Sequence, residues 1–259
     1  MFAFHGYGES AASFSFIGEA LDADHTLIAI DLPFHGLTEW REGLLFTAAQ
    51  LYEIMEKIVA SSAAASSAAA GSAQPWGLIG YSMGGRIVLQ LAENHPGSID
   101  KLVLLAPDGL KVNIWYWVAT RTVPGNLLFR WTMRRPGWLF LLLRMSHALR
   151  LVNPSIYKFA VHYIDDRTVR NDLYIRWTTM RKFRPDPAGI AAIIRRRQLP
   201  VSLVYGRYDR IIRWEQGEQF RKTGIEKCCR LTLLDTGHQL LRPQFLPLYL
   251  QIILLSPWC

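Results

Sequence analysis

The sequence has 259 residues, 50% of them hydrophobic and 12% aromatic, so it can bury a core as one α/β domain or two smaller ones and is not a disordered protein. Its net charge of +8 is uneven, because residues 109–200 contain 17 Lys or Arg against 4 Asp or Glu, while the rest of the chain is acidic. This imbalance predicts an inserted basic subdomain that faces anionic substrates or an anionic membrane surface, with a solvated helical surface as the alternative.

In chain order, the first part of the sequence alternates short apolar runs with segments of helical spacing. The predicted elements are a strand at 2–4, a helix at 11–21, a strand at 26–32, a helix at 46–60, a strand at 76–81, a helix at 86–92 and a strand at 99–106. The Ala- and Ser-rich residues 61–74 have low complexity and are predicted to form a frayed helix extension or a surface loop.

From about residue 110 the strand pattern disappears. Residues 110–198 show helical stretches rich in Trp, Tyr and Arg that prolines interrupt. The alternation then resumes with a strand at 201–205, a helix at 214–222, a strand at 231–234 and a closing amphipathic helix at 245–255. This order predicts an α/β protein with a doubly wound, mostly parallel sheet built from residues 1–109 and 199–259. The helical, basic segment 110–198 is inserted into it.

The residues Gly80-Tyr81-Ser82-Met83-Gly84 form a G-x-S-x-G sequence between an expected strand and an expected helix. A serine on such a strained turn projects its hydroxyl out of the backbone. Small residues are needed two positions before and after it, because a Cβ there collides with the neighbouring strand and helix. Ser82 is therefore the candidate nucleophile. The motif alone is weak evidence and needs partners in the right order.

Polar residues follow other predicted strands as well. His5 comes after the first strand, Asp209 after the fifth and His238 after the sixth. In a doubly wound sheet, ligands and catalytic groups gather at the carboxyl ends of the strands. The chain order Ser82, Asp209, His238 is the order expected when the nucleophile occupies an elbow in such a sheet.

These motifs resemble those of the α/β-hydrolase superfamily, in the esterase- and lipase-like branch of serine hydrolases that has a helical cap inserted after the strand following the elbow. The resemblance covers almost the whole chain. It rests on an oxyanion turn at 5–8, a D-x-P-x-H-G loop at 31–36, the elbow at 80–84, an acid turn at 206–209 and a histidine turn at 237–238. The haloalkane dehalogenase and epoxide hydrolase branches use aspartate at the elbow, where this chain has serine.

The resemblance implies a role for each of these residues. Ser82 attacks a carbonyl, His238 accepts and returns the proton, and Asp209 holds the imidazole in the required tautomer. The backbone N–H groups of Tyr7 and Met83 are implied as the oxyanion hole. An alternative acid, in the place of Asp209, is Asp108 at the end of the strand after the elbow; the Gly-x-x-Asp turn favours Asp209.

Four residues are candidates for substrate binding: His5, Gly6, Trp115 and Trp117. Gly6 and Gly8 are expected to adopt backbone angles that a Cβ forbids. His5 and His35 stand beside glycines, and bracing of the site by hydrogen bonds is the simpler expectation for both. The two tryptophans belong to the expected cap, whose aromatics line an apolar acyl or alcohol site or pack the cap onto the body.

The function implied by the resemblance is hydrolysis of a carboxylic ester with a hydrophobic acyl or alcohol part, through an acyl-enzyme on Ser82. The expected partner is a small-molecule ester, and no metal, cofactor or nucleic acid is expected. The same triad also serves C–C bond hydrolysis, thioester hydrolysis and acyl transfer. A hypothesis of another class is a non-catalytic protein that binds a lipid or a partner through its basic segment. The oligomeric state is not predicted.

Three cysteines, Cys228, Cys229 and Cys259, indicate no disulfide framework and no metal-ligand spacing. The sequence also has no secretory signal pattern at its start. Its longest central apolar run, at 138–143, is far shorter than the roughly 20 residues that span a bilayer. We therefore expect a soluble, cytoplasmic protein.

The sheet of the resembling family opens with two strands before the one found here at 2–4. No counterpart of these two strands is found in this sequence. Either the chain starts late, through truncation or a misassigned start, or the edge of its sheet is protected in a different way. An uncovered edge at 26–32 predicts aggregation or dimerisation.

Overall fold

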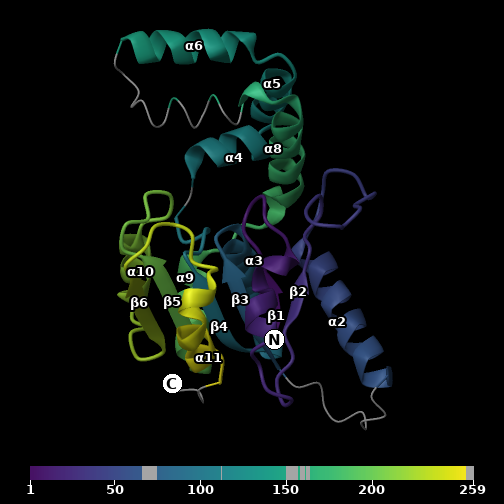
Figure 1. The fold of residues 1–259 in the computed structure, drawn as a ribbon, viewed down its shortest axis with the longest axis vertical. Coiled ribbons are helices and arrows are strands. Elements are labelled where there is room, and N and C mark those ends of the chain that lie inside the picture. The colour runs from purple at the N-terminus through teal and green to yellow at the C-terminus, as the bar shows by residue number, and fades with distance from the viewer. Residues whose placement is uncertain (66–74, 112, 150–156, 158–160, 162–163, 255–259) are drawn as a thin grey trace. The chain divides into compact units, whose positions relative to one another are not determined.

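The computed structural model describes residues 1–65, 75–111, 113–149, 157, 161 and 164–254 (Figure 1). Its strands are β1 (Phe2–Phe4), β2 (Ile28–Ile30), β3 (Trp76–Tyr81), β4 (Ile99–Leu105), β5 (Val201–Gly206) and β6 (Cys229–Leu234). Its α-helices are α1 (Ser15–Gly18), α2 (Ala48–Ala65), α3 (Met83–Asn94), α4 (Ile114–Arg121), α5 (Val123–Arg134), α6 (Gly137–Ala148), α8 (Arg167–Thr179), α9 (Pro187–Arg197), α10 (Trp214–Arg221) and α11 (Leu246–Leu254). Short 3-10 helices are η1 (Ala11–Phe14), η2 (Pro96–Ser98), η3 (Met180–Lys182) and η4 (Pro243–Phe245).

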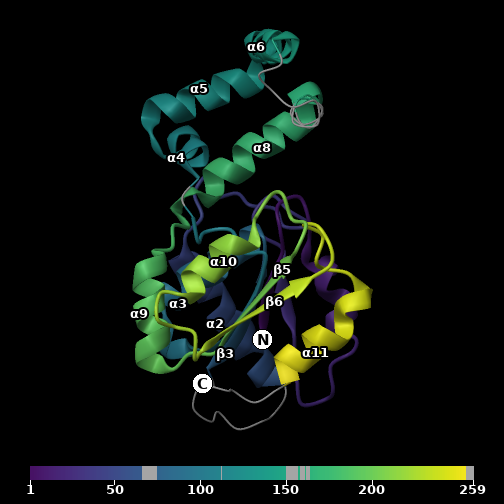
Figure 2. The ribbon, with the colours of Figure 1, turned by 90° about the vertical axis from the view of Figure 1, so that its left-hand side faces the viewer.

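The six strands form one parallel sheet in the order β2-β1-β3-β4-β5-β6 (Figure 1). The inner strands are almost wholly buried, as a parallel sheet covered on both faces requires. Figure 2 shows α3 and α9 on one side of the sheet and α11 on the other. A parallel sheet flanked by helices confirms the predicted α/β fold class. Since all strands run the same way, their carboxyl ends lie at the same end of the sheet.

Two predicted elements are shorter in the structure. The helix expected at 11–21 is a 3-10 turn followed by a single helical turn that ends at Gly18, since glycine costs about 1 kcal/mol in a helix relative to alanine. The buried strand expected at 26–32 contains only Ile28–Ile30, and these residues are half-buried. Their strand, β2, lies at the edge of the sheet and pairs with β1 alone. Short edge strands offer little template for aggregation.

The chain divides into two compact units. The first, which contains the sheet, comprises the described residues of Met1–Thr38, Thr47–Lys111 and Phe183–Cys259; the second comprises those of Glu39–Phe46 and Val112–Lys182. The predicted insertion spans 110–198, and α9, within that range, belongs to the sheet unit. Residues Glu39–Phe46 join the second unit, in part because the N–H of Phe46 donates to the carbonyl of Thr179 (3.1 Å). That link between distant segments has no local sequence signal.

In the second unit, the described residues between 113 and 182 are mainly helical, whereas Glu39–Phe46 forms neither helix nor strand. Helix α5 packs against α4 and α8 (Figure 2). The side chain of Asn126 connects all three helices, because its amide donates to the carbonyl of Ala119 and to the hydroxyl of Thr178 (3.1 Å each). The buried guanidinium of Arg170 donates to the carbonyl of Met133 over 3.0 Å. Polar side chains therefore satisfy backbone carbonyls inside this unit.

The cysteines depart from expectation. Cys229 is a buried free thiol, whereas Cys228 is disulfide-bonded, a bond that the expectation of no disulfide framework did not include. Spacing along the chain does not reveal which thiols folding brings together. Within the described residues, none of the helices has the length and apolar content needed to cross a membrane. The cytoplasmic location stays a prediction.

Candidate active site

Ser82 occupies the turn between β3 and α3. Its backbone has φ 50° and ψ −113°, a conformation that non-glycine residues rarely adopt. Hydrogen bonds on both sides hold the turn: the N–H of Ser82 donates to the carbonyl of Leu105, and its own carbonyl accepts from the N–H groups of Gly85 and Asp108, all at 2.9 Å. The strained turn is thus fixed by the end of β4 as well as by α3.

Three glycines around Ser82 are required by close approaches of backbone. A Cβ on Gly80 would lie 2.5 Å from the carbonyl oxygen of Gly84. A Cβ on Gly84 would overlap the carbonyl of Phe4 in the neighbouring strand, and one on Gly85 would overlap Pro107. Glycines are therefore needed at the elbow because any side chain there would collide with neighbouring backbone.

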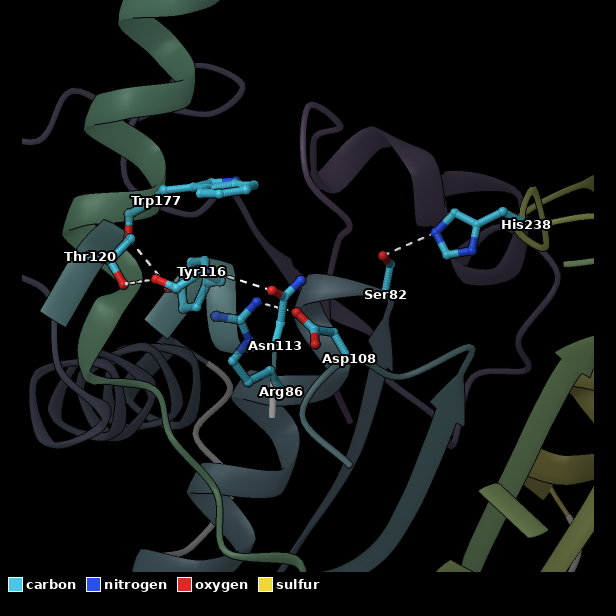
Figure 3. A network of polar contacts seen from close by, with 8 residues as sticks. All are labelled: Ser82, Arg86, Asp108, Asn113, Tyr116, Thr120, Trp177 and His238. Atoms are coloured by element: carbon cyan, nitrogen blue, oxygen red, sulfur yellow. Dashed lines mark hydrogen bonds and ion pairs between the residues drawn. The ribbon is translucent and has the colours of Figure 1, made fainter. Parts of the chain in front are cut away.

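The structure brings Ser82, His238 and Asp209 together. The Nε2 atom of His238 lies 3.1 Å from Oγ of Ser82 (Figure 3), and its Nδ1 atom lies 2.7 Å from Oδ2 of Asp209. The other carboxylate oxygen of Asp209 accepts from the N–H groups of Ile211 (2.7 Å) and Ile212 (3.0 Å). We assign the ring proton to Nδ1 of His238, because an ionised carboxylate only accepts, and with this tautomer Nε2 faces the serine hydroxyl as an acceptor.

Burial differs along this chain of residues. The side chain of Asp209 is fully buried, whereas that of His238 remains 16% exposed. All three residues belong to the sheet unit, at the carboxyl ends of β3, β5 and β6. Both carboxylate oxygens of Asp209 have hydrogen-bond partners, so the carboxylate is held in place. The fixed carboxylate in turn fixes the orientation of the imidazole.

The alternative acid, Asp108, has a different partner. Its carboxylate forms an ion pair with the guanidinium of Arg86 on α3 (Figure 3). Its backbone N–H supports the carbonyl of Ser82, as described above. Asp108 therefore contributes to the turn through its main chain, and its side chain is directed to Arg86 and not to His238.

The two residues predicted to form an oxyanion hole lie beside the elbow and after β1. Met83 is the first residue of α3, so its N–H has no acceptor within the helix. Tyr7 lies in the turn after β1 and is half-buried. Gly8 in this turn has φ 76°, which favours glycine, but Gly6 does not have a positive φ. Gly6 is instead limited by contact, because a Cβ there would lie 3.0 Å from the ring of Tyr81.

His5 is fully buried, and backbone groups engage both of its ring nitrogens. Nδ1 lies 2.8 Å from the carbonyl oxygen of Gly6, and Nε2 accepts from the N–H of Leu32 over 3.1 Å. The His5 ring therefore joins the turn after β1 to the loop after β2. Its ring lies 4.9 Å from that of His35. This geometry agrees with the expectation that His5 braces the site by hydrogen bonds. Neither ring nitrogen of His5 is left to bind a substrate.

Two residues near the site carried no signal in the sequence analysis. The hydroxyl of Tyr81 donates to the backbone carbonyl of His238 over 2.9 Å. Glu9 follows the turn after β1, and its Oε2 atom accepts from the N–H of Gly6 over 3.4 Å. Burial raises the pKa of the Glu9 carboxyl, an effect that this backbone hydrogen bond and the nearby His238 partly offset. The partners of Tyr81 lie too far along the chain for spacing to reveal them.

The tryptophans proposed for substrate binding lie in the second unit, on α4. The side chain of Trp115 is 83% exposed and that of Trp117 is 38% exposed. Between them, Tyr116 donates its hydroxyl to the carbonyl of Trp177 (3.3 Å), while its N–H is capped by Asn113 (Figure 3). These contacts fix α4 against α8. A role of Trp115 and Trp117 in substrate binding stays a prediction.

In the part of the chain that the structure describes, no group of three or more His, Cys, Asp or Glu is placed to hold a metal ion. The groups assembled at the sheet edge are a hydroxyl, an imidazole and a carboxylate. Such a set can carry out nucleophilic and general acid–base chemistry with protein atoms alone.

Comparison with known proteins agrees with this architecture. A family model described as the alpha/beta hydrolase fold matches residues 1–241. The uncharacterized hydrolase YugF of Bacillus subtilis is 25% identical over 241 residues, which make up 90% of this chain and 81% of YugF.

Solved structures extend the likeness to the fold as a whole. A probable hydrolytic enzyme from Pseudomonas aeruginosa PAO1 aligns with a TM-score of 0.64 at 16% identity, over 98% of this chain and 85% of that chain. The thioesterase domain from the curacin biosynthetic pathway aligns with a TM-score of 0.59 at 16% identity, over 98% of this chain and 90% of that chain. At these identities the solved structures are evidence for the fold and not for a substrate.

Proposed function

Because this chain belongs to the alpha/beta hydrolase fold family, we propose that it is a serine hydrolase that cleaves a carboxylic ester through an acyl-enzyme on Ser82. One observation carries the proposal: two hydrogen bonds, of 3.1 Å and 2.7 Å, connect Oγ of Ser82 through the imidazole of His238 to the carboxylate of Asp209. The family accounts for a hydrolase in general. The hydrogen bonds are what favour serine as the nucleophile.

In the proposed reaction, His238 accepts the proton of Ser82 at Nε2 as Oγ attacks the ester carbonyl. The imidazolium then gives this proton to the oxygen of the leaving alcohol as the C–O bond breaks, which leaves an acyl-enzyme. Water enters, His238 accepts a proton from it, and the resulting attack releases the acid and returns the proton to Ser82. Asp209 holds Nδ1–H throughout and stabilises the positive charge on the ring.

The charge that develops on the ester oxygen needs hydrogen-bond donors. We assign this role to the N–H groups of Met83 and Tyr7, the first at the positive end of α3 and the second in the turn after β1. Loss of one such donor costs roughly 3 kcal/mol in the transition state. The buried His5 supports the turn that carries Tyr7, through its hydrogen bonds to Gly6 and Leu32.

A fluorophosphonate probe and a series of p-nitrophenyl esters test the proposal. We expect the probe to label Ser82, and Ser82→Ala to lower kcat/KM by a factor on the order of 10^5. Ser98→Ala is the matched control, because Ser98 pairs with Tyr52 before β4, at the opposite end of the strands. Absence of labelling and of Ser82-dependent turnover in folded protein would contradict a serine hydrolase and leave a binding function.

The class of substrate is tested by varying the bond in matched compounds. The compounds are an oxygen ester, the corresponding thioester and a diketone that is cleaved at a C–C bond, all with the same acyl part. All three are needed because the same triad serves all three reactions. Preference for the oxygen ester, and for longer acyl chains, is the expected result. A higher kcat/KM for the thioester or the diketone would keep Ser82 as nucleophile and reassign the reaction.

A further inference from the structure

Helix α6 presents an apolar stripe to solvent. Trp138, Leu141, Leu142 and Met145 follow each other at the spacing i, i+3, i+4, i+7, which places them on one face of the helix. All four are exposed, Leu141 by 61% and Met145 by 54%, and no residue of α6 is buried. An amphipathic helix normally buries its apolar face against its own protein, so this stripe is an unusual feature.

The stripe continues on α5. Val123, Leu127 and Trp131 recur every fourth residue along this helix and are exposed by 75%, 59% and 47%. The opposite side of α5 is buried, with Thr132 and Met133 turned inward. The rings of Trp131 and Trp138 stack with their centroids 6.0 Å apart and join the two helices. We call the exposed residues of both helices the α5–α6 face: Val123, Leu127, Leu128, Trp131, Trp138, Leu141, Leu142 and Met145.

The segment that carries this face is rich in arginine and contains no acidic residue. Residues 113–149 contain five arginines and neither Asp nor Glu. Four of these arginines are exposed and form no ion pair with any residue that the structure describes: Arg130, Arg134, Arg135 and Arg144. By contrast, Arg207, Arg213 and Arg221 of the sheet unit each pair with a neighbouring carboxylate.

We propose that the α5–α6 face docks on the surface of an anionic lipid bilayer. The apolar stripe enters the boundary between headgroups and acyl chains, the paired tryptophans lie at headgroup level, and the arginines bind lipid phosphates. In this mode of binding the α5–α6 face lies in the plane of the bilayer surface, as amphipathic helices do. This proposal does not depend on the hydrolysis of an ester.

A second copy of the chain fits this face less well. In a two-fold symmetric dimer the same patch meets itself, so the unpaired arginines of both copies would come together without carboxylates to neutralise them. A bilayer with anionic headgroups offers apolar depth and negative charge at the same place. Charge complementarity therefore selects the lipid surface as the occupant.

The test is flotation of the 259-residue chain with vesicles of phosphatidylcholine alone or with about one third phosphatidylglycerol. We expect binding to the anionic vesicles only, weakened as salt rises from about 50 to 500 mM. Arg134→Gln/Arg135→Gln should weaken binding by about 25-fold, or about fivefold for each arginine. Arg196→Gln/Arg197→Gln removes the same charge from exposed positions at the end of α9, and should bind like wild type.

The apolar part of the proposal needs its own variants. Leu141→Ser/Met145→Ser should weaken binding at least tenfold, since two apolar side chains no longer enter the bilayer. Leu37→Ser is the control, because Leu37 is 95% exposed in the sheet unit. Circular dichroism and thermal melting establish that each variant is folded.

Three results would overturn the proposal. These are folded wild-type protein that does not bind anionic vesicles, equal losses for the two arginine pairs, and binding unchanged in Leu141→Ser/Met145→Ser. A concentration-dependent dimer that these serine substitutions abolish, without vesicle binding, would assign the α5–α6 face to self-association.

Discussion

The hydroxyl of Tyr81 donates a 2.9 Å hydrogen bond to the backbone carbonyl of His238. The residue directly before the elbow serine therefore supports the loop that carries the imidazole, 157 positions later in the chain. Its ring also lies 5.4 Å from the ring of His238. Burial raises the pKa of Tyr81 far above its ordinary value, with the nearby Glu9 carboxylate as a second cause, so the hydroxyl remains a donor.

We predict that Tyr81→Phe lowers kcat/KM by about five- to tenfold while the protein stays folded. The change removes only the hydroxyl, and the free energy of unfolding should fall by about 1 kcal/mol. Steady-state kinetics on an activated ester and chemical denaturation measure the two effects. Tyr52→Phe is the control, since it loses a 2.7 Å hydrogen bond to Ser98 at the other end of the strands. Equal kinetic effects in both variants would remove Tyr81 from the positioning of His238.

The choice between the two candidate acids gives a second prediction. Asp209→Asn keeps an oxygen for the N–H groups of Ile211 and Ile212 but presents an amide to Nδ1 of His238, which favours the wrong tautomer. We expect kcat to fall by a factor on the order of 10^4. Asp108→Asn breaks the pair with Arg86 and should retain kcat within about tenfold. The reverse order of effects in folded variants would make Asp108 the acid.

The elbow glycines give a prediction about stability. Gly84→Ala places a methyl group on the carbonyl of Phe4, so the free energy of unfolding should fall by about 3 kcal/mol or more, or soluble expression should be lost. Gly137→Ala, at the start of α6, meets no atom within 4 Å and should change stability by less than about 1 kcal/mol. Thermal melting compares the two; a stable Gly84→Ala protein would show that the turn can move away from β1.

Glu9 gives a prediction about pH. Its pKa is raised in the folded protein, mainly by burial, so the folded state binds the proton more tightly than the unfolded chain. The free energy of unfolding contributed by Glu9 therefore falls as the pH rises from the unfolded to the folded pKa of this carboxyl. Glu9→Gln should remove this decline. Relative to wild type, the variant should therefore be more stable at neutral pH than it is at acidic pH.

Melting temperatures of wild type and Glu9→Gln between about pH 4 and 7 test this sign. Glu53→Gln is the opposite control, because the hydrogen bond from Lys57 lowers the pKa of Glu53. Its ionised form is favoured by folding, so that substitution should destabilise the protein more at neutral than at acidic pH. A wild-type minus Glu9→Gln difference that does not vary with pH would contradict the prediction.

The sequence by itself determined the order of strands and helices and the position of the elbow. Apolar runs at 2–4, 76–81 and 201–205 and the glycines around Ser82 are local signals, because burial of a strand and the closeness of two backbones act on neighbouring residues. Two predictions from local signals were too long. The helix expected at 11–21 ends at a glycine, and the strand expected at 26–32 is short because it lies at the edge of the sheet.

Only the tertiary structure decided which polar groups meet. Asp108 is close to Ser82 in the chain, yet its carboxylate faces Arg86, while Asp209 reaches His238 because β5 and β6 are neighbours in the sheet. The contact of Tyr81 with His238 depends on the same strand order. Helical periodicity likewise identifies an apolar face on α5 and α6, but burial elsewhere in the chain decides whether such a face is covered. Contacts between distant segments depend on topology and loop geometry, which spacing along the sequence does not encode.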